Sequence, residues 1–221
     1  MLVMMTAVLW DFGGVILTSP FEAFRRYEIQ HELPADHIRS VNTTNPHSNA
    51  WALLERNEIG PGEFDTLFAN ESEALGHRVA GADVLALLGG DVRPEMVTML
   101  DRVKAAGFRT ACLTNNVIAG DGVGDDLPGQ DLARGDRAAQ IAAIMDRFDV
   151  IVESSKVGVR KPEPRFYEIA CELLGVQADE CVFLDDLGIN LKPAAAMGMT
   201  TIKVTSAAQA IADLSATLGW T

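Results

Sequence analysis

The sequence predicts a doubly wound α/β domain, with a parallel sheet between two layers of helices and an all-α subdomain inserted after the first strand. From about residue 91 onward, short apolar runs alternate with amphipathic helical stretches, which is typical of successive βαβ units. Residues 19–90, in contrast, follow a single apolar run with helical patterns only. No internal repeat or low-complexity tract interrupts these patterns.

The amino-acid composition limits the size of the fold and the kinds of molecule that the protein is expected to bind. With 221 residues, of which 48% are hydrophobic, the chain can form one large domain or a core with a smaller insert. Its net charge of -13 repels nucleic acid and anionic lipid, so neither is an expected partner. The sequence shows no basic leader with a cleavage site, and no apolar run of the about 18 residues that a membrane span needs. We therefore expect a cytoplasmic monomer or homodimer.

The first predicted strand, Val8–Trp10, ends at Asp11. Ligands of open α/β sheets bind outside the carboxyl ends of the strands, so Asp11 is a candidate nucleophile or metal ligand. Gly13 and Gly14, which follow, allow a sharp turn and a close approach of the backbone to a ligand. An aspartate that only caps the next turn is the alternative interpretation, and other segments must decide between the two.

Residues 19–90 have the pattern of a helical subdomain. Proline, glycine and asparagine turns separate five predicted helices, at Phe21–Glu32, Pro34–Val41, Asn49–Arg56, Pro61–Ala80 and Ala82–Leu88. A simple crossover needs about a dozen residues, so this longer segment is expected to form a cap over the strand ends. Its aromatic residues Trp51, Phe64 and Phe68 are predicted to form the core of the cap. Its histidines lack metal-ligand spacing and are expected to lie on the surface or to pack within the cap: His31, His37, His47 and His77.

The rest of the chain alternates between the two patterns. Helices are predicted at Arg93–Gly107, Arg137–Phe148 and Glu163–Leu174, and another, which ends at Met197, after a turn at Gly188-Ile189-Asn190. Strands are predicted at Phe108–Leu113, Asp149–Val152, Cys181–Leu184 and Thr201–Val204. Ala119–Gly135 has no periodicity and is predicted to be a surface loop. Its acidic residues lack the closing glutamate of a calcium loop: Asp121, Asp125 and Asp126. Three cysteines lie in apolar runs and are expected to be buried thiols: Cys112, Cys171 and Cys181.

Polar residues stand at or soon after the ends of four predicted strands, namely Asp11, Thr114 with Asn115, Lys161, and Asp185 with Asp186. In a parallel sheet these groups gather along one edge. Together they supply what phosphoryl transfer needs: a carboxylate that attacks phosphorus, further carboxylates for Mg²⁺, a hydroxyl and an amide for phosphate oxygens, and a lysine that neutralises charge. Each group alone also fits a turn, a helix cap or the surface, so the prediction depends on their order and placement.

In this order, the residues resemble the haloacid dehalogenase superfamily, whose members are mostly Mg²⁺-dependent phosphatases with a Rossmann-like core. The resemblance implies that Asp11 is the nucleophile, Thr114 the phosphate-binding hydroxyl and Lys161 the catalytic lysine. Asp185 and Asp186 match the acidic fourth motif of the family. Two stretches, Val159–Pro164 and Phe183–Ala194, are especially similar to the N-terminal phosphatase domain of soluble epoxide hydrolases.

The resemblance also implies a domain division and a ligand set. The α/β core would comprise residues 1–18 and 91–221, with strand order 5-4-1-2-3, and residues 19–90 would be the C1 cap of the family. Mg²⁺ would be held mainly by Asp186, with Asp185 beside it, and by Asp11 and the Gly13 carbonyl. The phosphate would lie against Asn115, Lys161 and the glycines Gly13 and Gly14, and Asn190 would support the site.

One position departs from the family pattern. Family phosphatases usually carry a second aspartate two residues after the nucleophile, where this chain has Gly13. That aspartate protonates the leaving group and later activates water, which contributes roughly 10²- to 10⁴-fold to the rate. We expect a Mg²⁺-dependent phosphatase of a small phosphorylated metabolite, made slow by the missing acid, because the acidic pair Asp185 and Asp186 argues for a metal and hence for phosphate. The alternatives are a binder of a phosphorylated or acidic small molecule and displacement of halide from 2-haloacids, where no proton is needed. Two roles also stay open for three arginines, which either add positive charge near the substrate or lie on the surface: Arg25, Arg26 and Arg160.

Overall fold

The computed structural model describes residues 4–116 and 130–220, with the side chains of residues 130–134 excepted. A sheet of five parallel strands forms the centre of the fold, in the order β3-β2-β1-β4-β5. The parallel sheet and this order were both predicted. The strands are β1 (Ala7–Trp10), β2 (Arg109–Thr114), β3 (Val150–Glu153), β4 (Cys181–Asp185) and β5 (Thr200–Lys203).

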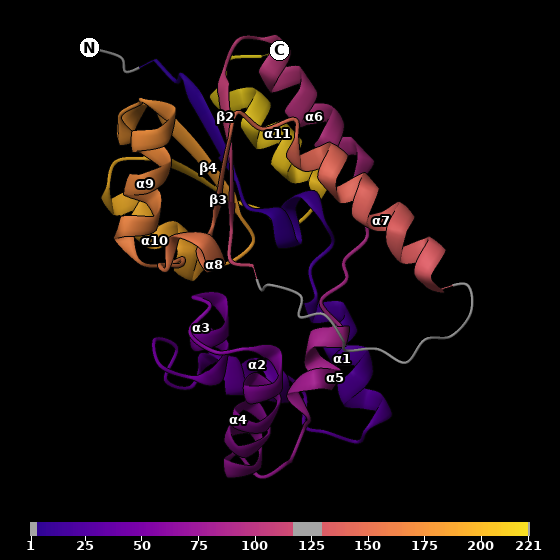
Figure 1. Ribbon diagram of the computed structural model, residues 1–221. Helices are drawn as coiled ribbons and strands as arrows, with labels where there is room; N and C mark the ends of the chain where they lie inside the picture. The colour runs from indigo at the N-terminus through magenta and orange to yellow at the C-terminus, as the bar shows by residue number, and fades with distance from the viewer. Residues whose placement is uncertain (1–3, 117–129, 221) are drawn as a thin grey trace.

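Helices cover both faces of the sheet, as Figure 1 shows. On one face, α6 (Pro94–Ala105), α7 (Gln130–Met145) and α11 (Ala207–Thr217) pack on side chains such as Val8 and Trp10. On the other face, α9 (Pro164–Leu174) and α10 (Gly188–Ala196) pack on the alternate side chains of the same strands. Both faces of β1 and β4 are therefore buried, which explains why these strands are apolar throughout.

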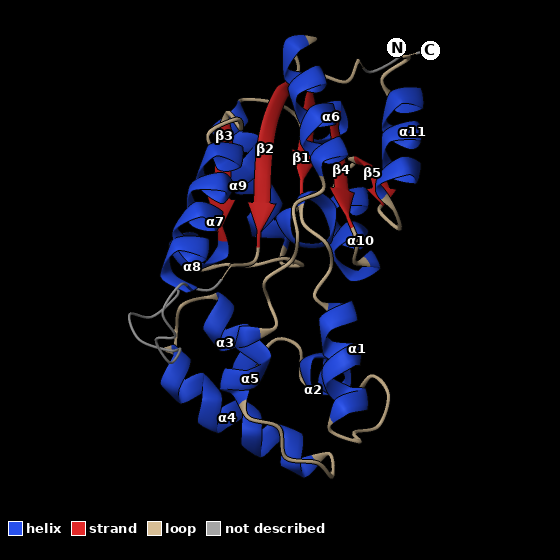
Figure 2. Cartoon of the chain, turned by 90° about the vertical axis from the view of Figure 1, so that its right-hand side faces the viewer, coloured by secondary structure: helices blue, strands red, loops and turns tan. Residues whose placement is uncertain are grey.

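The segment between β1 and α6 forms five helices around a core of its own, which we call the helical insert (residues 19–90). They are α1 (Phe21–Gln30), α2 (His37–Thr43), α3 (Ala50–Glu55), α4 (Pro61–Ala74) and α5 (Gly81–Ala86). The predicted aromatic core is confirmed, because Phe64 and Phe68 are fully buried and Trp51 packs edge-on against Phe64. The strand arrows in Figure 2 point toward the insert, so the carboxyl edge of the sheet faces it.

Two short segments connect the insert to the core, and they are paired with each other. Leu17 and Val92 form an isolated antiparallel bridge. On either side of this bridge the Arg93 amide donates to Ile16, and the Thr18 amide donates to Asp91 at 2.8 Å. The insert therefore enters and leaves the core at one place.

Apart from the single-turn helix α8 (Ser154–Val157), which was not predicted, and from shifts of a few residues at other helix ends, three helices differ from the prediction. The fourth helix ends at Ala74 rather than Ala80, because the chain turns at Gly76 with a φ of 100°. The helix predicted from Arg137 begins at Gln130, so the last part of the predicted 119–135 loop is helical. The rest of that loop, with Asp121, Asp125 and Asp126, falls outside the described residues.

The third difference is α11, which the sequence patterns did not predict. Its N-cap is Ser206, whose side chain accepts a hydrogen bond from the Gln209 amide, and its residues Ala210 and Leu214 are fully buried in the core. Among the residues described, no helix has both the length and the apolar character that a membrane crossing requires. The three cysteines are buried free thiols, as expected.

Candidate active site

The first and fourth strands bring three carboxylates together at the carboxyl edge of the sheet. β1 and β4 are neighbours in register, with Trp10 opposite Leu184, and the amide of Asp11 donates to the Leu184 carbonyl at 2.8 Å. Asp11 and Asp185 therefore lie next to each other, at the carboxyl ends of adjacent strands. Asp186 completes the group, and one carboxylate oxygen from each of the three lies within 4.8 Å of the others.

Lys161 lies between two of these carboxylates. Its side chain is 1% exposed, and its Nζ is 2.7 Å from Asp11 Oδ1 and 2.8 Å from Asp185 Oδ2. Burial by itself would lower the pKa of Lys161, but the charges of Asp11 and Asp185 outweigh burial and raise it. Lys161 is therefore an ammonium ion at neutral pH.

Asp11 is held through one of its two carboxylate oxygens. Oδ1 accepts a hydrogen bond from the Phe12 amide at 2.7 Å and also forms the ion pair with Lys161. Burial raises the pKa of Asp11 well above its ordinary value, and the nearby charge of Asp185 adds to this, while Lys161 opposes it. Asp11 thus caps the turn that follows it and also belongs to the carboxylate cluster, so the two interpretations of the sequence are compatible.

Asp185 is fully buried and its hydrogen bonds fix its orientation. Its Oδ1 accepts from the Leu187 amide at 2.7 Å, and the Asn190 side-chain amide donates to both oxygens at 3.1 and 3.0 Å. Tyr167, which is also fully buried, donates its hydroxyl to the Asn190 carbonyl at 2.6 Å. Asn190 therefore holds Asp185 in the position where it meets Lys161.

Asp186 is less buried than its neighbour and lies against Gly14. A Cβ on Gly14 would be 2.2 Å from Asp186 Oδ2, and Gly14 also has a φ of 79°, which favours glycine. The Ser19 hydroxyl donates to Asp186 Oδ2 at 3.0 Å. Burial raises the pKa of Asp186, and the charge of Asp185 adds to this. Gly14 thus makes room for this carboxylate at the edge of the site.

The cluster has the composition of a site for a divalent cation. Three carboxylates face the single ammonium of Lys161, so negative charge is in excess. Carboxylate oxygens are the ligands that Mg²⁺ prefers, and it commonly binds through one or two of them. The residues present therefore fit this ion.

The residues that follow β2 complete the site. Thr114 ends β2 and is buried. The Asn115 side chain forms two hydrogen bonds with the main chain of Lys161: Oδ1 accepts from the Lys161 amide at 2.9 Å, and Nδ2 donates to the Lys161 carbonyl at 3.0 Å. The Asn115 side chain therefore holds the lysine segment in place, a contact that strand-end reasoning did not suggest.

Two further residues at the site were not singled out from the sequence. Ser19 contacts Asp186, and Glu55 of α3 accepts a hydrogen bond from Asn115 Nδ2 at 3.2 Å. Neither has a local signal that points to a site, because their contacts depend on how the insert lies on the core. Arg160, for which two roles stayed open, is paired with Glu55, whereas Arg25 and Arg26 are exposed.

None of the four histidines belongs to the carboxylate cluster that the described residues form. His37 is buried within the insert, where its Nε2 lies 2.9 Å from the Ser72 hydroxyl and 3.0 Å from the His77 carbonyl. The rings of His37 and His77 also pack edge to face. These two histidines thus pack within the insert.

Comparison with characterised proteins finds relatives of more than one kind. The chain is 33% identical to mouse acyl-CoA dehydrogenase family member 10 and 30% identical to mouse bifunctional epoxide hydrolase 2, over 97% and 95% of its length. It spans only 19% and 38% of those two longer proteins. It is also 30% identical to phosphatase MT3486 of Mycobacterium tuberculosis, with 92% of this chain and 89% of that protein covered.

Solved structures show the same fold. One is a haloacid dehalogenase family enzyme from Bacteroides thetaiotaomicron in complex with magnesium and inorganic phosphate, with a TM-score of 0.57, 19% identity and coverage of 90% of this chain and 93% of that one. Another is the L-2-haloacid dehalogenase of Xanthobacter autotrophicus with chloropropionic acid covalently bound, with a TM-score of 0.58, 18% identity and coverage of 91% and 78%.

The chain also matches the sequence model of a protein family. The model of the haloacid dehalogenase-like hydrolases matches residues 5–198. This range includes the first four strands, β1 to β4, and the whole carboxylate cluster. The range begins before β1 and continues past β4, so the helical insert lies within the matched part as well. The chain is therefore a member of the haloacid dehalogenase superfamily of hydrolases.

Proposed function

We propose that the protein is a Mg²⁺-dependent phosphatase of a small phosphorylated metabolite, with Asp11 as its nucleophile. The observation that carries the proposal is the buried Asp11–Lys161 ion pair beside two further carboxylates, at the edge where β1 and β4 end. We propose further that residues 1–18 and 91–221 form the catalytic core and that the helical insert is its cap. The similarity to a phosphatase along nearly the whole chain supports this function over other hydrolase reactions.

The nucleophile follows from the contacts of Asp11. Oδ1 is held by the Phe12 amide and Lys161, so Oδ2 is the oxygen that we propose attacks phosphorus. A bond forms between Oδ2 and phosphorus while the bond to the leaving oxygen breaks, which gives an aspartyl phosphate. Water then attacks the same phosphorus, and Asp11 and inorganic phosphate are released. With Gly13 in place of the usual acid, the leaving oxygen takes its proton from solvent.

The remaining residues stabilise charge or hold others in place. The Lys161 ammonium and the Thr114 hydroxyl would bind phosphate oxygens, against the main chain of Gly13 and Gly14. Asp186, Asp11 and the Gly13 carbonyl would hold Mg²⁺, with Asp185 beside them. When bound, the ion supplies positive charge to the phosphoryl oxygens. Because the Asn115 amide is occupied by Lys161, we propose that Asn115 serves the phosphate site indirectly, through the lysine.

Halide displacement is the second candidate function. The glycine at position 13 favours it, because a halide ion leaves without a proton. The three-carboxylate cluster favours phosphate instead, because it fits a divalent cation, and such an ion supplies positive charge to phosphoryl oxygens, whereas displacement of halide needs no metal. A binding protein that holds a phosphorylated or acidic molecule without turnover is the third possibility, and it too follows from Gly13.

One set of assays separates these functions. Phosphate release is measured from p-nitrophenyl phosphate and a set of phosphorylated metabolites, with and without Mg²⁺, and chloride release from 2-haloacids without it. We expect Mg²⁺-dependent phosphate release, which Asp11→Asn abolishes because an amide does not form the phosphoenzyme. Chloride release by the wild type, with no phosphate release, would show a dehalogenase. Tight binding of a phosphorylated metabolite without turnover would show a binding protein.

A further inference from the structure

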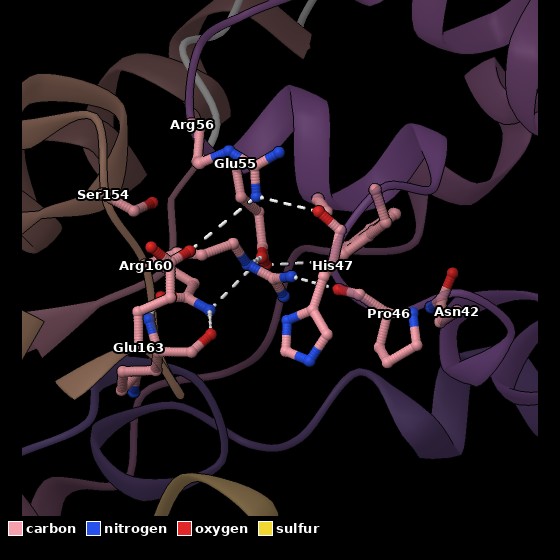
Figure 3. Close-up of polar contacts among 12 residues, drawn as sticks. Asn42, Pro46, His47, Glu55, Arg56, Ser154, Arg160 and Glu163 are labelled. Atoms are coloured by element: carbon pink, nitrogen blue, oxygen red, sulfur yellow. Dashed lines mark hydrogen bonds and ion pairs between the residues drawn. The ribbon is translucent and has the colours of Figure 1, made fainter. Parts of the chain in front are cut away.

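Two consecutive residues at the end of α3 form ion pairs with the core (Figure 3). Glu55 pairs with Arg160, with its Oε2 2.5 Å from the arginine Nε. The next residue, Arg56, lies with its Nη1 3.8 Å from Glu163 Oε1. Each charge on the insert thus faces an opposite charge on the core, and the two pairs have opposite polarity. Exchanging the partners of the two pairs would bring like charges together, so the pairs favour the observed contacts between insert and core.

The Glu55 pair is the more buried of the two. The side chains of Glu55 and Arg160 are 8% and 13% exposed, whereas Glu163 is 33% exposed. The Trp51 indole donates to the other Glu55 oxygen at 2.9 Å, and Arg160 donates to the Pro46 carbonyl at 2.9 Å. Burial raises the pKa of Glu55, and the Arg160 guanidinium opposes this. The carboxylate therefore has a specific partner on each oxygen.

Glu55 also contacts the residue that holds Lys161. Its Oε2 accepts from Asn115 Nδ2 at 3.2 Å, and the same Nδ2 donates to the Lys161 carbonyl at 3.0 Å. The Asn115 Oδ1 accepts from the Lys161 amide at 2.9 Å. An uninterrupted series of contacts therefore links the insert to the lysine that pairs with Asp11.

We propose that Glu55 is a positioning residue for Lys161. When the insert rests on the core, Glu55 orients the Asn115 amide, and Asn115 then holds the Lys161 main chain so that the ammonium meets Asp11. Arg160 allows the carboxylate to be buried there as an ion. The catalytic consequence rests on the proposed phosphatase function, whereas the structural link from Glu55 to Lys161 does not.

Hydrogen exchange of a single amide tests the structural link without an activity assay. The Lys161 amide is protected by its bond to Asn115 Oδ1, so its exchange rate in the folded protein reports whether that bond persists. We expect Glu55→Ala to speed this exchange by about tenfold or more. Glu55→Gln keeps the size and an acceptor oxygen for Asn115, so it should stay within about threefold of the wild type. Melting curves of both variants show whether they fold.

Arg56→Ala is the matched control. It removes the other ion pair of the same interface, together with the contacts of Arg56 with Glu58 and the His47 carbonyl inside the insert, and the hydrogen bond from Asn115 goes to Glu55 instead. We expect it to leave the Lys161 exchange rate within about threefold of the wild type. Equal effects of Arg56→Ala and Glu55→Ala, or of Glu55→Gln and Glu55→Ala, would overturn the proposal, because seating of the insert alone would then explain them.

Kinetics test the catalytic consequence. For p-nitrophenyl phosphate with Mg²⁺, Glu55→Ala should lower kcat by about tenfold to a hundredfold, since misplaced catalytic groups cost on that order, while KM changes less than about threefold. Asn115→Ala should act in the same way, and the double variant should be no worse than either single one. A wild-type kcat in Glu55→Ala would overturn the positioning role. If the wild type itself releases no phosphate, the proposed function fails, and the amide exchange still decides whether Glu55 positions Lys161.

Discussion

Gly13 has the backbone conformation of an ordinary residue. Its φ is -71° and its ψ is 132°, and a Cβ built there meets no atom within 4 Å. An aspartate therefore fits at the position where family phosphatases usually carry one. The glycine is not required by the turn, so the missing acid is a chemical difference rather than a steric one.

The first prediction follows from this conformation. Gly13→Asp should raise the turnover of alkyl phosphates by about an order of magnitude or more, because it supplies the proton that an alkoxide leaving group needs. The wild type should strongly prefer aryl and acyl phosphates, whose leaving groups need little protonation. Steady-state rates across a series of leaving-group pKa values measure both effects.

Gly13→Asn is the control for this prediction, since it has the same shape and carries no acidic proton. It should give no gain with alkyl phosphates. A wild-type enzyme that hydrolyses alkyl phosphates at ordinary rates near ~10 s⁻¹ would contradict our account of Gly13, and another acid would then have replaced it.

Gly14, the next residue, is required by the structure, which gives the second prediction. Gly14→Ala should abolish activity and lower stability by about 1–2 kcal/mol or more, because it combines a left-handed conformation with a Cβ on top of the Asp186 carboxylate. Gly107→Ala is the control: Gly107 also has a positive φ, of 90°, but open space around it. It should lower stability by about 1 kcal/mol and keep activity. Urea unfolding and phosphate release measure the two effects, and equal loss of activity in both variants would contradict the role of the Asp186 contact.

At the scale of elements, Asp149 ties α6, β2 and β3 together at the edge opposite the site. Its Oδ2 accepts from the Thr110 amide at 2.8 Å and from the Thr110 hydroxyl at 3.0 Å, and its Oδ1 pairs with Lys104 at 2.9 Å. Burial would raise the pKa of Asp149, but the bonds from Lys104 and Thr110 outweigh it and lower the pKa. The pKa is thus lower in the folded than in the unfolded chain.

The third prediction concerns acid stability. Because the folded pKa is depressed, Asp149 contributes stability above its unfolded pKa of about 3.9, and the contribution is lost as pH falls through the folded value. Because the Asp149 side chain is 40% exposed and solvent screens its charge, Asp149→Ala should lower the free energy of unfolding by only about 0.5–1 kcal/mol at pH 5–8, and the difference should shrink below about pH 4. Urea titrations over this pH range measure it. The exposed Asp146, as Asp146→Ala, serves as the control, and a deficit that persists unchanged in acid would refute the assignment.

The fourth prediction concerns the whole folded molecule, because the three carboxylates lie at the ends of β1 and β4 and come together only when the sheet forms. Mg²⁺ that binds only the folded chain should raise the melting temperature, by an amount equivalent to about 2.7 kcal/mol at a hundred times its Kd. Asp186→Asn should remove this dependence. Without Mg²⁺ it should be at least as stable as the wild type, because one of three mutually repelling carboxylates is gone. Melting curves with increasing Mg²⁺ test this, and a full Mg²⁺ response in Asp186→Asn would exclude Asp186 as a ligand.

The sequence by itself determined the sheet and the gathering of the polar residues. Buried parallel strands are apolar throughout, and each must be followed by a crossover, so the order of runs and helices already specifies a doubly wound sheet. Once the strands are parallel, Asp11 and Asp185 have to lie at the same edge of the sheet. The helical pattern of residues 19–90 likewise indicated the insert. These features follow from patterns that lie within a few residues of one another, whereas the strand order was implied only by the family resemblance.

Tertiary structure alone decided which side chains meet across the two parts of the chain. Glu55 is followed by 59 residues before Asn115, and Ser19 lies 167 residues from Asp186, so no local pattern links either pair. The presence of α11 was also missed: its residues Ala210 and Leu214 are buried, and most of the stability of such a short helix comes from packing on the core. Contacts of this kind depend on the position of the whole insert or helix on the core, and that position is set by burial summed over many residues.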